Sequence, residues 1–193
     1  THWGVRYSQH YGYALGEFWE PEGVAVDADG DVYVADTNHH CIQKFTADGV
    51  GLGMWGTWSS SEGDFSYPSG ITIDSFGTIY VADSGNDRIV HYSSTGTQLN
   101  AWGTTGTGPG EFNYPWGITV DPLGEVYVAD NGNDRIQWFR PNGTFGSEWG
   151  YTGTGPGQLS CPRGIVANGS NQVFVADACN SRIQRYNTSG QFQ

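Results

Sequence analysis

The chain has 193 residues, and its 8 Lys and Arg against 20 Asp and Glu give a formal net charge of −12. This acidic excess argues against nucleic acid or an anionic membrane as a partner, because both are bound largely through attraction to phosphate. No apolar run approaches the roughly 18 residues of a membrane helix, and no signal-like segment opens the chain. Because the first residue is Thr rather than Met, we allow for a mature or excised form from which an address has been removed.

One pattern occurs four times along the chain. Its prolines, Pro21, Pro68, Pro115 and Pro162, recur at an interval of 47 residues, so four units and five further residues account for the whole length. A strict period of this size indicates a repeat architecture, and we interpret residues 1–193 as a single domain. The 30 glycines and 15% aromatic residues favour short strands and tight turns over helices.

Each unit is expected to hold four short strands. The first strand follows Pro-x-Gly and is expected to be the innermost, and an Asp-to-Gly turn then leads to a second strand that ends in Asp. The third strand follows a polar loop, and the fourth ends in Trp-Gly. In the first unit these strands are expected at 24–26, 32–36, 42–45 and up to 55–56. Four antiparallel strands per unit are typical of a propeller blade.

The pattern Pro-x-Gly-[Ile/Val]-x-[Val/Ile]-Asp, then [Val/Ile]-Tyr-Val-Ala-Asp, then Asn-x-Arg-Ile resembles the NHL repeat family of β-propellers over essentially the whole chain. The resemblance implies an all-β propeller of four NHL-like, four-stranded blades. The first unit departs from it, with His39, His40 and Cys41 where the others have Asn-Asp-Arg or Asn-Ser-Arg. Some animal NHL proteins bind RNA, but the acidic charge argues against that role here.

The two ends of the chain look like halves of one strand. The last unit stops at Phe192-Gln193, and joining it to the N-terminus restores the missing Trp-Gly as Trp3-Gly4. The N-terminal segment is expected to complete the last blade, either within its own chain or in a neighbouring subunit. The close register favours closure within one chain, whereas the six blades usual in the family disfavour a ring of four. The second completion predicts a larger ring or a filament.

Three Asp–Arg pairs recur at one place in the units: Asp83 with Arg88, Asp130 with Arg135, and Asp177 with Arg182. A catalyst rarely needs three identical copies. An Arg that ties a loop to a carboxylate stabilises each blade in the same way, so we interpret these pairs as structural.

Cys161 and Cys179 are expected to form a disulfide. If the turn at Gly169-Ser170 centres the hairpin of the last unit, the two cysteines face each other across its strands at a suitable distance; a free thiol pair is the alternative. A disulfide favours an oxidising, extracellular location. Cys41 is left over, either unpaired or available for an intermolecular bond.

The residue x of Pro-x-Gly differs in all four units, although the residues on either side of it repeat. Glu22, Ser69, Trp116 and Arg163 occupy it and are expected at one rim of the central channel, where they either bind a small polar ligand or a peptide end, or simply fill the channel. The NHL-like amidating lyase has zinc histidines toward its axis, and histidine at x would suit such a site. Its absence here argues against that chemistry.

Other candidate sites have simpler interpretations. His39, His40 and Cys41 are adjacent and cannot all converge on one ion, so we expect no metal. Asp27, Asp29 and Asp31 resemble part of a calcium loop, but Val32 stands where its glycine should be, which favours a solvated turn. Sequons begin at Asn142, Asn168 and Asn187, in turns that are open to glycosylation if the protein is secreted.

Taken together, these features predict a non-enzymatic, secreted interaction module without catalytic residues or cofactor. It is expected to bind protein or glycan partners, with no nucleic acid and no membrane insertion, and to self-assemble as a homo-oligomer or filament through the divided strand. The alternative is an NHL-like lyase or hydrolase at the channel mouth, with Glu22 or Arg163 as its polar groups.

Overall fold

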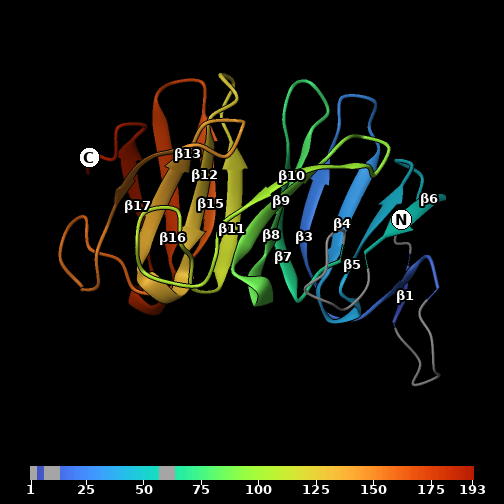
Figure 1. The fold of residues 1–193 in the computed structure, drawn as a ribbon, viewed down its shortest axis with the longest axis horizontal. Helices are drawn as coiled ribbons and strands as arrows, with labels where there is room; N and C mark the ends of the chain where they lie inside the picture. The colour runs from blue at the N-terminus through green and yellow to red at the C-terminus, as the bar shows by residue number, and fades with distance from the viewer. Residues whose placement is uncertain (1–3, 7–13, 57–63) are drawn as a thin grey trace.

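The computed structural model describes residues 4–6, 14–56 and 64–193. It is an all-β propeller of four blades, which stand side by side in chain order (Figure 1). The 47-residue period therefore corresponds to one blade, as the sequence predicts. In the described ranges, no helix is long and apolar enough to span a membrane.

The first three blades are four-stranded antiparallel sheets. Their strands are β3 (Pro21–Val26), β4 (Val32–Asp36), β5 (Cys41–Phe45) and β6 (Gly51–Trp55); β7 (Pro68–Ile73), β8 (Ile79–Asp83), β9 (Arg88–Tyr92) and β10 (Gln98–Trp102); and β11 (Pro115–Val120), β12 (Val126–Asp130), β13 (Arg135–Phe139) and β14 (Phe145–Trp149). Blade four has β15 (Pro162–Asn168), β16 (Gln172–Asp177) and β17 (Arg182–Asn187). Its fourth strand is reduced to one bridge between Tyr186 and Phe192.

Short elements join these strands. A single 3-10 turn follows the second strand of every blade: η1 (Thr37–His39), η2 (Ser84–Asn86), η3 (Asn131–Asn133) and η4 (Ala178–Asn180). Each turn ends on a residue in the left-handed conformation, which redirects the chain into the third strand. Near the N-terminus, β1 (Val5–Arg6) pairs in parallel with β2 (Glu17–Phe18).

The second strand of each internal blade is buried on both faces, because a neighbouring blade covers each side. All five residues of β8 and of β12 are buried. Their β-branched and aromatic residues suit such a position. The core therefore consists of apolar clusters between consecutive blades rather than one central cluster, and Tyr33, Tyr80 and Tyr127 each lie in one of them.

The first strands lie innermost and next to one another, as the sequence predicts: β3 contacts β7, β7 contacts β11, and β11 contacts β15. Further out, an apolar residue at the start of each unit fills the gap between blades. Phe65, Phe112 and Leu159 are fully buried in this role. Each packs against the glycine of a Trp-Gly pair, so closely that a Cβ on Gly103 would lie 2.5 Å from the Phe112 ring.

The array is open. β1 lies at one end of the row and β17 at the other in Figure 1, so the described residues do not close a four-bladed ring within one chain. Trp3, the residue proposed to complete the last blade, lies outside the described residues. Gly4 packs against Phe18 as Gly56 packs against Phe65, which places it in the expected Trp-Gly register. Of the two completions, the own-chain version is not formed by the described residues, because Gly4 lies against Phe18 of blade one.

Candidate functional site

The four x positions come together at the start of the innermost strands. A cavity of about 330 Å³ is lined by Glu22, Ser69, Trp116 and Arg163, together with the residues that follow them. The glycine after x lets the innermost strands of neighbouring blades approach each other closely. A Cβ on Gly117 would lie 2.0 Å from the carbonyl oxygen of Arg163, so the strands pack backbone to backbone. We call the four x residues the rim.

The rim combines opposite charges with an aromatic surface. The Arg163 guanidinium lies 4.4 Å from the centre of the Trp116 ring, a distance at which cation and ring attract one another. Glu22 lies close enough for its pKa to respond to Arg163: burial raises the pKa of Glu22, the Arg163 charge lowers it, and Glu20 raises it. Both charged residues are exposed, so they remain available to a ligand.

Ser69 has a different environment from its three counterparts. It is buried, its hydroxyl lies 2.6 Å from that of Ser84, and it donates to the Trp116 carbonyl oxygen at 2.9 Å. The bond to Trp116 links blade two to blade three. The structure therefore gives Ser69 a structural position, and three rim residues are left to contact a ligand.

Tyr114 is a neighbour of the rim that the sequence interpretation missed. Its ring centre lies 5.7 Å from that of Trp116, and 37% of the residue is exposed. Burial raises the pKa of Tyr114, and the charges of Glu22 and Tyr67 add to the shift. Its backbone is left-handed, with φ of 53°. Tyr114 directly precedes Pro115 of the Pro-x-Gly motif, and this position in the sequence could have placed it beside the rim.

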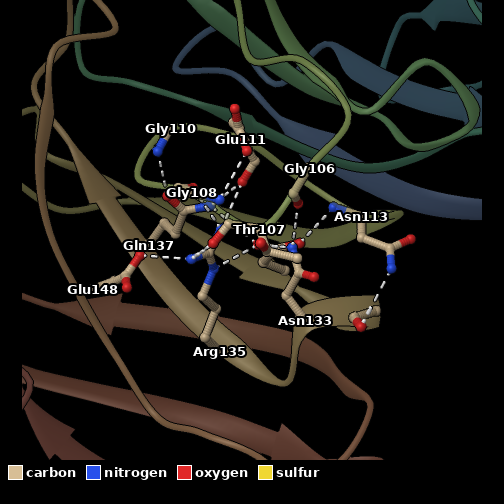
Figure 2. A network of polar contacts seen from close by, with 12 residues as sticks. Gly106, Thr107, Gly108, Gly110, Glu111, Asn113, Asn133, Arg135, Gln137 and Glu148 are labelled. Atoms are coloured by element: carbon tan, nitrogen blue, oxygen red, sulfur yellow. Dashed lines mark hydrogen bonds and ion pairs between the residues drawn. The ribbon is translucent and has the colours of Figure 1, made fainter.

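The Asp–Arg pairs are formed in all three blades that contain them. The Arg Nε lies 2.7 Å from Asp Oδ2 for Arg88 and Asp83, 2.8 Å for Arg135 and Asp130, and 2.7 Å for Arg182 and Asp177. Arg135 also donates to three carbonyl oxygens in residues 107–111 and to Glu148 (Figure 2). Each Arg therefore holds the loop that enters its blade, which is a structural role.

Blade one replaces this arrangement. The Asp36 carboxylate pairs with His39 Nδ1 and accepts from Gln43 Nε2, both at 2.7 Å. Cys41 takes the place of Arg and is fully buried. Burial and the Asp36 charge both raise the pKa of its thiol. Cys41 is a free, buried cysteine in this structure, and its burial disfavours an intermolecular disulfide.

A second repeated contact joins blade to blade, and the sequence interpretation missed it. In blades one to three, the residue that ends the 3-10 turn accepts a hydrogen bond from a backbone N–H of the next blade: His40 Nδ1 from Tyr67 at 3.0 Å, Asp87 from Tyr114 at 2.6 Å, and Asp134 from Cys161 at 2.7 Å. Asp87 and Asp134 also accept from the hydroxyls of Thr105 and Thr152.

The His40 contact makes the junction between blades one and two sensitive to pH. Burial and His39 lower the pKa of His40, against the opposing effect of Asp36. Protonation is therefore less favourable in the folded chain, and stability falls as pH drops from about 6.5 through the lowered value. Relative to His40→Asp, which restores the residue of blades two and three, we expect the natural chain to lose at most about 1 kcal/mol of unfolding free energy in this range, because His40 is partly exposed and one hydrogen bond is affected. Chemical denaturation at a series of pH values measures the difference, and parallel curves would contradict it.

The predicted disulfide between Cys161 and Cys179 is present, with Cα atoms 5.4 Å apart. The inner hairpin register is as expected, since Ile165 pairs with Val175. The cysteines, however, lie just beyond the strands, Cys161 before β15 and Cys179 in η4, because a bulge shifts the register near Pro162. The bond therefore joins two loops rather than two strands.

The acidic turn and the sequons are ordinary turns in the structure. Asp27 Oδ1 accepts the backbone N–H groups of Asp29 and Asp31, so this carboxylate caps its own turn. Among the described residues, no group of three or more His, Cys, Asp or Glu is placed to hold a metal. The sequon residues Asn142, Asn168 and Asn187 cap turns in the same way, each accepting from the residue two positions on.

Solved structures of similar fold are larger than this chain. Virginiamycin B lyase from Staphylococcus aureus superposes with a TM-score of 0.69 at 21% identity, over 90% of this chain and 54% of the lyase. Hydrazine synthase of Kuenenia stuttgartiensis gives 0.69 at 16% identity, over 94% of this chain and 51% of that one. These likenesses concern the fold, and the chain spans about half of each structure.

Sequence relatives share a short segment. The B-box type zinc finger protein ncl-1 of Caenorhabditis elegans and the protein brain tumor of Drosophila melanogaster are each 54% identical over 39 residues, 20% of this chain. The chain covers only 5% and 4% of their lengths. The NHL repeat profile matches four segments, residues 18–45, 65–92, 112–139 and 159–186, one in each blade. The chain therefore belongs to the NHL repeat family.

Proposed function

We propose that residues 1–193 form a non-enzymatic interaction module that takes a protein partner at the rim. The observation that carries this proposal is the exposed Arg163 guanidinium over the Trp116 ring, in a cavity that the exposed Glu22 also lines. A guanidinium held over an indole ring presents its N–H groups to a carboxylate, and a nearby carboxylate attracts an ammonium group. An exposed peptide end offers such charges beside an apolar side chain.

An extracellular setting is part of the proposal. The disulfide between Cys161 and Cys179 is stable under oxidising conditions, and the sequons lie in turns. We expect the most exposed of them, at Asn142, to accept a glycan more readily than those at Asn168 and Asn187, whose side-chain amides donate to Gln172 and Gln191. A glycan on the partner is a second ligand class for the same surface.

Self-assembly is a further part of the proposal. The outer edge of blade four carries only the bridge between Tyr186 and Phe192, where the other blades carry a full strand. The N-terminal segment of a neighbouring copy, ending in Gly4, has the sequence to fill this edge. Strand addition would then join the copies into a ring or a filament.

An enzymatic role remains the alternative hypothesis. At 21% identity, the similarity to the lyases concerns the fold and gives no evidence of the same catalytic activity in this chain. An NHL-like lyase or hydrolase here would use Glu22 or Arg163 as its polar groups. Turnover of a bound probe, or a stoichiometric zinc ion, would favour this alternative over a binding module.

Peptide titration tests the proposed function. The probe is a short N-acetylated peptide with a free C-terminal carboxylate, compared by calorimetry with its C-terminal amide. We expect Arg163→Ala to weaken binding of the carboxylate form at least about tenfold, because it removes a charge-assisted hydrogen bond. Arg185→Ala is the matched control, since Arg185 is exposed on β17 and absent from the rim cavity. Equal binding by both variants would refute the rim as the site.

A further inference from the structure

We propose that the rim binds a quaternary ammonium group, which replaces the Arg163 guanidinium over the Trp116 ring, beside Glu22. The inference rests on the proposed function in placing a ligand at the rim, and it deepens that function by naming a chemical class of ligand group. Trp116 lies in blade three, which has a described blade on either side (Figure 1), so its surroundings come from within the chain.

The position over Trp116 already holds a cation. The Arg163 guanidinium lies 4.4 Å from the centre of this ring. The Tyr114 ring lies 5.7 Å from the same ring and is tilted by 53° against it. Indole gives the strongest attraction between a cation and a side-chain ring, and a second ring beside it adds electron-rich surface. We call Trp116, Tyr114 and Glu22 the cation site.

The Arg163 side chain is held in this position by the ring contact. Across residues 4–6, 14–56 and 64–193, no hydrogen bond or ion pair fixes its guanidinium, and the residue is exposed. The cation–ring contact of blade one is different, because Lys44, 4.9 Å from the centre of the Tyr33 ring, also pairs with Asp31 at 2.9 Å. Lys44 is therefore fixed, whereas Arg163 can leave its ring without losing a hydrogen bond to the described chain.

Glu22 supplies the negative charge of the cation site. Its carboxylate forms no ion pair with the described residues, although it lines the same cavity as Trp116 and Arg163. Burial raises the pKa of Glu22 more than the Arg163 charge lowers it, and Glu20 raises it further. Arg163 thus offsets only part of the cost of burying this charge, and a closer cation would be stabilised there. The net charge of −12 also attracts cations to the molecule as a whole.

The lining of the cavity favours a cation without N–H groups. Ile71, Ile118 and Ile165 form apolar parts of its wall. The Ser69 hydroxyl already donates to the Trp116 carbonyl oxygen at 2.9 Å. A primary ammonium or guanidinium group from a ligand would leave some of its donors without acceptors here. A quaternary ammonium has no such donors, and its methyl groups pack on aromatic and aliphatic surface.

Choline and its uncharged carbon analogue, in which a tert-butyl group replaces the trimethylammonium group, test the proposal. NMR spectra of the indole N–H groups follow both titrations, and the Trp116 signal is identified by its absence in Trp116→Leu. We expect choline to shift this signal and to bind at least about tenfold more tightly than the analogue, because only choline is attracted by the ring and the carboxylate. Equal affinity for the two compounds would overturn the proposal.

Substitutions locate the bound cation. Trp116→Leu should weaken choline binding at least about tenfold, and Glu22→Gln about three- to tenfold, as measured by saturation-transfer NMR on choline. Tyr151→Leu is the matched control, because Tyr151 is 64% exposed and does not line the cavity. Equal thermal unfolding of these variants verifies that they fold. Choline binding that is the same in Trp116→Leu and Tyr151→Leu would show that the cation binds elsewhere.

Arg163→Ala separates this proposal from the proposed function. The substitution empties the position over Trp116, so choline binding should tighten at least about threefold, whereas binding of the peptide carboxylate should weaken. Arg185→Ala removes the same charge away from the cavity and controls for the change in net charge. Choline affinity that is no higher in Arg163→Ala than in Arg185→Ala would overturn the replacement of Arg163. Failure of the peptide titration alone would refute the peptide partner and leave the cation site standing.

Discussion

Replacing Asp130 by alanine should lower the free energy of unfolding by about 3 kcal/mol. The Asp130 carboxylate is fully buried and accepts from Arg135, Asn133 and Gln137 at 2.8, 2.9 and 3.0 Å. Its other oxygen accepts the backbone N–H of Asn113 at 2.9 Å. Without the carboxylate, these four donors, which include the buried Arg135 guanidinium, lose the acceptor that they share. Urea denaturation followed by tryptophan fluorescence measures the change.

Blade four provides the matched comparison. Asp177 pairs with Arg182 in the same geometry, but the Arg182 side chain is 30% exposed and that of Arg135 only 8%. Water compensates part of the loss there, so Asp177→Ala should cost about half as much as Asp130→Ala. Asp130→Ala combined with Arg135→Met removes both charges and should be less harmful than Asp130→Ala alone. Equal costs for the two alanine variants would show that burial does not set the strength of these networks.

The internal structure of a blade was predictable because it depends on local chemistry. The 47-residue period located each Pro-x-Gly, and the apolar and β-branched runs located the strands. The hairpin centred at Gly169-Ser170 was sufficient to pair Cys161 with Cys179. These features depend on spacing within one unit, which a sequence displays directly.

The arrangement of one blade against the next was less predictable. The angle between blades arises from the sum of many packing contacts, so the register of the two ends did not reveal that the array is open. The hydrogen bonds from Asp87 and Asp134 to the next blade depend on a left-handed residue that brings the side chain across the gap. From the sequence alone, Asp87 would be predicted to be a solvated loop residue.

The rim was predictable in position but not in exposure. The one varied place in the repeat did mark the residues that line a common cavity. Variation alone does not distinguish Arg163, which is exposed, from Ser69, which is 2% exposed and hydrogen-bonded to blade three. That difference depends on the neighbouring blade, which supplies the Trp116 carbonyl oxygen.

Gly117→Ala should also cost about 3 kcal/mol of unfolding free energy, because the new methyl group would meet backbone rather than a movable side chain. Its Cβ would lie 2.0 Å from the Arg163 oxygen and 3.1 Å from the Arg163 carbonyl carbon. The innermost strands β11 and β15 would have to separate, and the cavity at the rim would widen with them. Urea denaturation measures the loss of stability.

Gly164→Ala is the same substitution at the same place in the repeat, with only the Ala176 Cβ at 3.5 Å. At concentrations where the chain is monomeric, it should leave stability unchanged or raise it by about 0.5 kcal/mol, because alanine restricts the unfolded chain. If Gly164→Ala destabilised the monomer as much as Gly117→Ala does, the glycine would be required within its own blade. Close approach of the next blade would then not explain why Pro-x-Gly recurs.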